Sequence, residues 1–106
     1  MNEATAEKPY TVLVDDNFDY MDEDKRYQHG AFATLEEAVQ ACQVIVDDFM
    51  HRTYRPGMSA AALYQEYVAA GEDPFIVGPG AKFSAWTYAK ERCEALCGGR
   101  VEQKGA

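Results

Sequence analysis

Acidic side chains that could bind a cation are concentrated in residues 15–24. Six of the eighteen acidic residues lie there: Asp15, Asp16, Asp19, Asp22, Glu23 and Asp24. The stretch begins like a calcium-binding loop, with oxygen ligands at positions 1, 3 and 5, which are Asp15, Asn17 and Asp19. The pattern then fails, because position 6 requires glycine and is Tyr20, and position 12 requires glutamate and is Arg26. The sequence therefore excludes an EF-hand loop and favours a solvated acidic loop, while a looser cation site stays open.

A second candidate site is the stretch between a predicted strand and a predicted helix, residues 78–84. Four of its residues suit a small anion: Gly78, Gly80, Lys82 and Ser84. Glycines allow close backbone approach, a helix N-terminus offers free N–H groups, and a lysine adds positive charge. The spacing is not that of a P-loop, since Lys82 is followed by Phe83. A tight turn leading into a capped helix explains the same residues and is the favoured interpretation.

The remaining chemically active side chains form no recognisable constellation. Cys93 and Cys97 are one helical turn apart, but neither histidine lies at metal-ligand spacing, so both are interpreted as helix residues facing the core. His29 and His51 fall on different predicted elements, and no nucleophile elbow is present. We predict no catalytic residue, no metal site and no cofactor.

The element that must organise these residues is a helix over Leu35–Thr53. Thr34 and Glu37 match the capping box at its start, and Pro56 with Gly57 prevents its continuation. Its apolar residues fall on one side at helical spacing: Leu35, Ala38, Val39, Cys42, Ile45, Val46, Phe49 and Met50. Val44 is the exception, an apolar residue on the polar side.

The other segments complete an α+β pattern. Strands are predicted over Tyr10–Val14, Arg26–Ala33 and Phe75–Val77, and further helices over Ala60–Ala70 and Ala85–Cys97. The order is β-β-α-α-β-α, which predicts a small antiparallel sheet of about three strands with three helices in two layers. The first two strands are expected to pair as a hairpin. We predict one domain over residues 10–98, with flexible tails over residues 1–9 and 99–106.

Composition restricts the partners. The chain has 106 residues, 47% of them hydrophobic, and a formal net charge of −8. Such a surface repels nucleic-acid backbones and anionic membranes, so we expect no nucleic acid and no membrane partner. No export signal is recognised in the first residues, and the three cysteines are an odd number, so a cytoplasmic protein with reduced thiols is expected.

Four runs of residues resemble a family of small bacterial proteins that carry no assigned activity: Val14–Asp24, Gly30–Ala38, Gly71–Phe75 and Phe83–Cys93. The resemblance covers about residues 10–97. It implies a bacterial, single-domain, cytoplasmic protein and transfers no catalytic residue.

Two functions follow as expectations. The first is a non-catalytic module that binds another protein or itself, because tyrosine and tryptophan are enriched at interfaces. Tyr20, Tyr54 and Tyr64 are the candidates for its exposed surface. The alternative is a small-anion or nucleotide-binding protein that uses the turn from Gly78 to Ser84.

Overall fold

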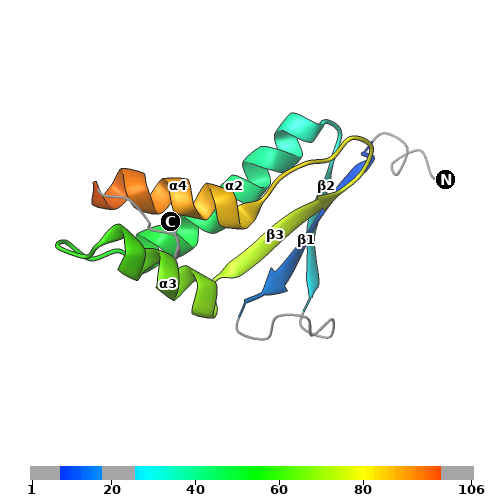
Figure 1. Ribbon diagram of the computed structural model, residues 1–106. Helices are drawn as coiled ribbons and strands as arrows, with labels where there is room; N and C mark the ends of the chain where they lie inside the picture. Colours follow the sequence, from blue (N-terminus) through cyan, green and yellow to red (C-terminus); the bar gives the residue numbers. More distant parts are fainter. Residues whose placement is uncertain (1–7, 18–25, 99–106) are drawn as a thin grey trace.

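The fold is a three-stranded antiparallel sheet with three helices (Figure 1). The computed structural model describes residues 8–17 and 26–98. The element order is β1 Tyr10–Asp16, β2 Tyr27–Phe32, α2 Leu35–Thr53, α3 Ala60–Ala70, β3 Glu72–Val77 and α4 Ala85–Cys97. The predicted α+β class and order are therefore confirmed. Tyr20, most of the acidic stretch, the tail over residues 99–106 and most of the tail over residues 1–9 lie outside the described residues.

The strands lie in the order β2-β1-β3, and both pairings are antiparallel. β1 pairs with β2 from Tyr10 opposite Phe32 to Val14 opposite Tyr27, which confirms the predicted hairpin. The register shifts once, between Val12 and Leu13. β1 is thus the central strand, and β2 and β3 are the edges.

The third strand is longer than the sequence pattern predicts. β3 begins at Glu72 instead of Phe75, and so includes Asp73 and Pro74. A proline inside a strand argues against a central strand, because it lacks the N–H needed for the sheet ladder. At the edge of a sheet it is tolerated, and β3 is an edge strand. The longer strand brings Asp73 into the sheet, directly opposite Asp15.

Each helix begins at a hydroxyl side chain that accepts a hydrogen bond from a backbone N–H of the first turn. Thr34 accepts from Glu37 at 3.1 Å, Ser59 from Ala62 at 3.1 Å, and Ser84 from Thr87 at 3.2 Å. These caps confirm the three predicted helix starts.

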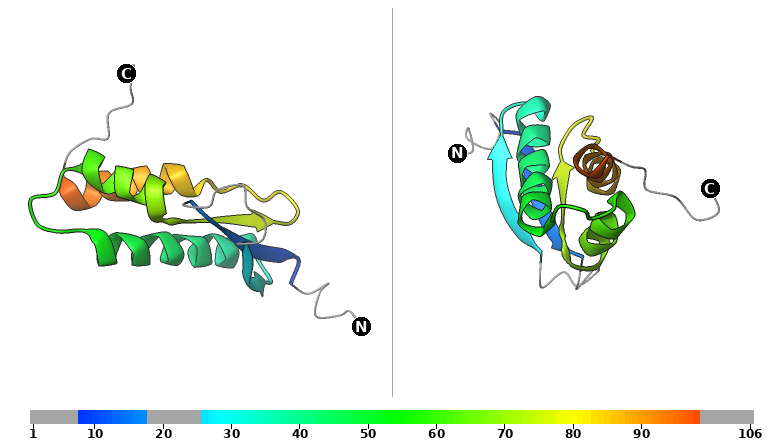
Figure 2. Two further views of the ribbon diagram at one scale, coloured as in Figure 1. Left: turned by 90° about the horizontal axis from the view of Figure 1, so that it is seen from below. Right: turned by 90° about the vertical axis from the view of Figure 1, so that its left-hand side faces the viewer.

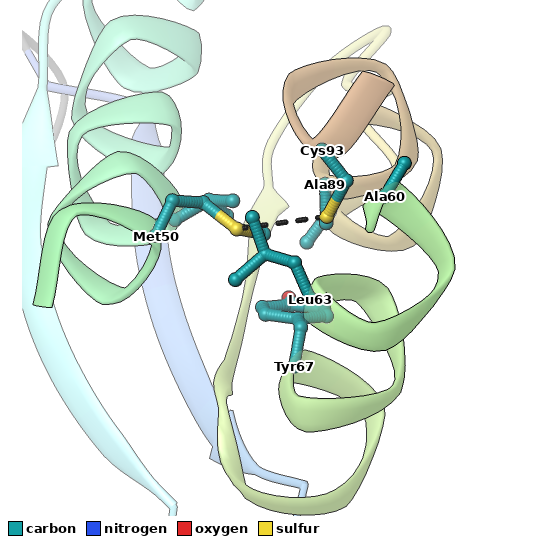
Figure 3. Close-up of a cluster of buried hydrophobic side chains, with 8 residues drawn as sticks. Met50, Ala60, Leu63, Tyr67, Ala89 and Cys93 are labelled. Atoms are coloured by element: carbon teal, nitrogen blue, oxygen red, sulfur yellow. Dashed lines mark hydrogen bonds between the residues drawn. The ribbon is translucent and has the colours of Figure 1, made fainter. Parts of the chain in front are cut away.

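The buried side chains form two clusters, one at the sheet and one among the helices. The first cluster joins β1 to α2 through Val12, Val14, Ala38, Cys42 and Ile45. The second joins α2, α3 and α4 through Val46, Met50, Ala60, Leu63, Tyr67, Ala85, Ala89 and Cys93. Figure 3 shows Met50, Leu63, Tyr67 and Cys93 converging from the three helices, with the Cys93 and Met50 sulfur atoms 3.8 Å apart. Burial of a side chain as large as Leu63 contributes about 1.5–3 kcal/mol to folding.

The two faces of the sheet differ. Val12 and Val14 point toward α2, together with Ile76 from β3. Side chains alternate along a strand, so the register places three cross-strand pairs on the other face: Thr11 with Val77, Leu13 with Phe75, and Asp15 with Asp73. We call these six residues the open face. Among the described residues, Leu13, Phe75 and Val77 belong to neither core cluster, and Val77 is 51% exposed.

Candidate functional site

The residues of the predicted anion turn each have a structural role. A Cβ on Gly78 would lie 2.5 Å from the Tyr10 ring, so the close approach of the turn to β1 requires glycine. Gly80 has a φ of +66°, which favours glycine. The Ser84 hydroxyl caps α4, and Lys82 is exposed.

The turn also places the start of α4 beside the free edge of β3. A pocket of about 500 Å³, open to solvent, lies between the two elements. It is lined by Asp73, Phe75, Phe83, Ser84, Ala85 and Trp86. Figure 2 shows the arrangement that produces it, with β3 running between α2 on one side and the α3–α4 pair on the other. We call this cavity the Asp73 pocket.

Of the four residues predicted to bind an anion, the Asp73 pocket includes only Ser84. The pocket's carboxylate is Asp73, whose negative charge opposes an anion at the same helix N-terminus. Anion binding at the turn stays a prediction for four residues: Gly78, Gly80, Lys82 and Ser84. The negative charge of Asp73 argues against it.

Asp73 is the residue of the pocket whose charged form is disfavoured by its surroundings. Burial raises the pKa of its carboxyl above the usual value of 3.8, a hydrogen bond from the Trp86 side chain lowers it, and the negative charge of Asp15 raises it. Like charges directly opposite each other on neighbouring strands are destabilising. The chain thus places two carboxylates side by side on the open face at a cost in stability.

Arg26 compensates one member of this pair. Its Nε lies 2.6 Å from Asp15 Oδ1, and its Nη2 lies 3.3 Å from Oδ2, so the contact is bidentate. The same guanidinium lies over the ring of Phe75, 5.1 Å from the centroid. Phe75 therefore already accepts a cation against its ring, while Arg26 is not among the residues that line the Asp73 pocket.

The pocket combines an anionic group with apolar walls. Phe75, Phe83 and Trp86 supply aromatic surface, and Trp86 also packs edge-on against the buried Tyr67, at 6.2 Å between ring centroids. Aromatic faces and a carboxylate attract an organic cation, whereas they offer little to an anion. In the described part of the chain, no group of three or more potential metal ligands forms a metal site.

Sequence reasoning missed Asp73, Phe75 and Trp86 as a group. The predicted third strand begins at Phe75, so Asp73 falls outside it. Had β3 been extended to Glu72, period-two alternation would have placed Asp73 and Phe75 on one face. The position of Trp86 beside them depends on the return of the chain through the turn, which no local pattern encodes.

The other singled-out residues lie elsewhere. Tyr54 and Tyr64 are half-buried and pack against the helix cluster, so they are less exposed than the sequence indicates. Burial raises the pKa of the Cys42 and Cys93 thiols to about 12, so both are neutral near pH 7 and poor nucleophiles. Cys97 is also a free thiol.

A second groove lies between β2 and α2. Its volume is about 600 Å³, and its lining is mostly small and apolar, including Ala31, Phe32 and Ala41. Val44, 66% exposed as its position in the helix pattern predicts, lies at its border. Its two charged residues, Lys8 and Glu37, have opposite signs, and its one aromatic residue is Phe32, so the groove does not favour one kind of ligand as the Asp73 pocket does.

Comparison with protein-family models, curated proteins and solved structures finds no match to this chain. Within the described residues, no helix is both long enough and apolar enough to cross a membrane.

Proposed function

We propose that this protein is a non-catalytic interaction module that docks a basic partner protein on the open face of its sheet. The observation that carries the proposal is the apolar strip of that face. Leu13 and Phe75 are directly opposed and only half-buried, and Val77 at the end of the strip is 51% exposed. Apolar side chains grouped beside charged ones are typical of protein interaction sites.

Charge decides what kind of partner fits. The chain carries a formal net charge of −8, and the open face adds the Asp15–Asp73 pair beside its apolar strip. A second copy of the same chain would bring like charge to this surface, whereas a basic partner is attracted to it and steered toward it. This supports a different, basic protein over self-association.

We infer that the module works in the cytoplasm of a bacterium. Its three cysteines are all free thiols, which agrees with a reducing compartment.

The test is a pull-down that uses two exposed valines as a matched pair. Val77, on the open face, is 51% exposed, and Val44, on the outer side of α2, is 66% exposed. Immobilised wild-type protein is compared with immobilised Val77→Lys and Val44→Lys. We expect wild type and Val44→Lys to retain the same basic protein, identified by mass spectrometry, and Val77→Lys to lose it. Equal retention by both variants, or retention only of a second copy of the chain, would contradict the proposal.

A further inference from the structure

We propose that the Asp73 pocket binds the side-chain cation of a lysine or arginine presented by the partner protein. This inference rests on the proposed function and identifies the group on the partner that is recognised. The pocket adjoins the apolar strip, because Phe75 belongs to both. A partner segment that covers Leu13 and Phe75 therefore passes the mouth of the pocket.

The lining residues match a lysine or arginine side chain in their charge and in their apolar surface. The Asp73 carboxylate supplies the counter-charge, and its neighbour across the strands is the carboxylate of Asp15. Phe75 and Trp86 supply rings, and such rings attract cations through the negative charge of their faces. The long aliphatic stem of lysine or arginine suits the apolar walls, since such stems bury well while the charged head stays polar.

The protein itself contains a small-scale version of the same recognition. Arg26 places its guanidinium over Phe75 and pairs with Asp15, so one ring and one carboxylate of the open face already hold a cation. Asp73 and Trp86 bring a second carboxylate and a second ring together at the pocket. A volume of about 500 Å³ is enough for one long side chain.

Burial of Asp73 is costly in the free protein, and a bound cation would reverse that cost. An opposite charge within about 4–6 Å favours the ionised carboxylate, whereas burial and Asp15 disfavour it. Ligand binding and ionisation of Asp73 should therefore support each other, and affinity should fall as the solution is acidified and as salt is added.

Trp86 makes the test direct, because it is the only tryptophan of the chain and lines the pocket. The protein is titrated with Nα-acetyl-lysine amide, with Nα-acetyl-arginine amide and with Nα-acetyl-norleucine amide, which has a comparable chain length and no charge. Trp86 fluorescence and the indole N–H resonance in an NMR spectrum report binding. We expect a saturable response to the two basic ligands and none to norleucine.

Two variants separate specific recognition from bulk charge. Asp73→Asn keeps an acceptor for the Trp86 side chain but removes the charge, and we expect at least tenfold weaker binding. Asp48→Asn removes one charge from a side chain that is 66% exposed on α2, and it should bind like wild type. Dispersed backbone amide resonances in the NMR spectrum of Asp73→Asn show that the variant is folded.

The outcomes distinguish this inference from the proposed function. No saturable Trp86 response at millimolar ligand, or equal affinity in Asp73→Asn, overturns the pocket assignment even where partner capture depends on Val77. A response that depends on Asp73, combined with partner capture that ignores Val77, leaves the pocket as a cation site and overturns docking on the open face.

Discussion

Two half-buried carboxylates, Asp47 on α2 and Asp73 on β3, each contact α4 but have opposite surroundings. Asp47 accepts hydrogen bonds from the Tyr88 hydroxyl at 2.9 and 3.0 Å and from Arg92 Nε at 3.0 Å. Asp73 has the neutral Trp86 side chain as a hydrogen-bond donor and a second carboxylate, Asp15, as its cross-strand neighbour.

The difference separates a structural group from a binding group. The Asp47 cluster joins two helices and compensates its own charge, as expected of a contact that stabilises the fold. Burial, followed by the hydrogen bond to Asp47, raises the pKa of Tyr88 to about 12, so its hydroxyl stays a donor at all neutral pH values. Asp73 instead lines a pocket, where a perturbed carboxyl is a candidate for ligand recognition.

The largest expected effect is on Asp47. Asp47→Ala should lower the free energy of unfolding by about 2 kcal/mol, because it leaves the Tyr88 hydroxyl and the Arg92 guanidinium half-buried without their acceptor. Urea denaturation measures it. The adjacent Asp48→Ala is the matched control: Asp48 pairs with Arg52 in an exposed contact, so its loss should change stability by at most about 0.5 kcal/mol. Equal effects of the two substitutions would show that the Asp47 cluster is no more than a surface contact.

A smaller effect is expected for Tyr88→Phe. It removes only the hydroxyl and keeps the ring, which lies 6.1 Å from the Phe83 ring between centroids, so the loss should be about 1 kcal/mol. Combined with Asp47→Ala, it should add much less than its effect alone, because the two groups share one hydrogen-bonded cluster. Full additivity in the double variant would mean that the contact between Tyr88 and Asp47 does not hold α2 to α4.

The fold followed from local sequence signals, and the candidate site did not. The hydroxyl caps at Thr34, Ser59 and Ser84 and the apolar periodicity of α2 are written in neighbouring residues, so helix positions could be predicted closely. Two of the six residues of the open face, Thr11 and Leu13, were equally readable, since the predicted strand Tyr10–Val14 alternates between two faces. The Asp73 pocket depends on contacts between residues far apart in the chain, Asp15 with Asp73 and Asp73 with Trp86, and on a strand that continues through Pro74.

The anion turn shows that unusual residues can have a structural explanation even where a binding site is predicted. Its glycines and serine were correctly recognised as unusual, but contact with Tyr10, a positive φ and a helix cap account for Gly78, Gly80 and Ser84 without a ligand. Glycine in a turn therefore carries less functional information than a charged residue placed in a cavity.

The smallest change in stability is expected at Asp73 itself, and its sign matters more than its size. Because the folded-state pKa of Asp73 is raised, its contribution to stability is complete below the usual value of 3.8 and is lost as pH rises through the raised value. At pH 7 the wild-type protein therefore carries the cost of a buried carboxylate. Asp73→Asn removes that cost and keeps an oxygen acceptor for Trp86. Its free energy of unfolding at pH 7 should therefore be at most about 0.5 kcal/mol below that of wild type, or above it. Measured from pH 4 to pH 7, the difference between variant and wild type should move in favour of the variant, with Asp48→Asn as the control for net charge. A large loss of stability in Asp73→Asn at neutral pH would place Asp73 with Asp47, as a group that holds the fold together.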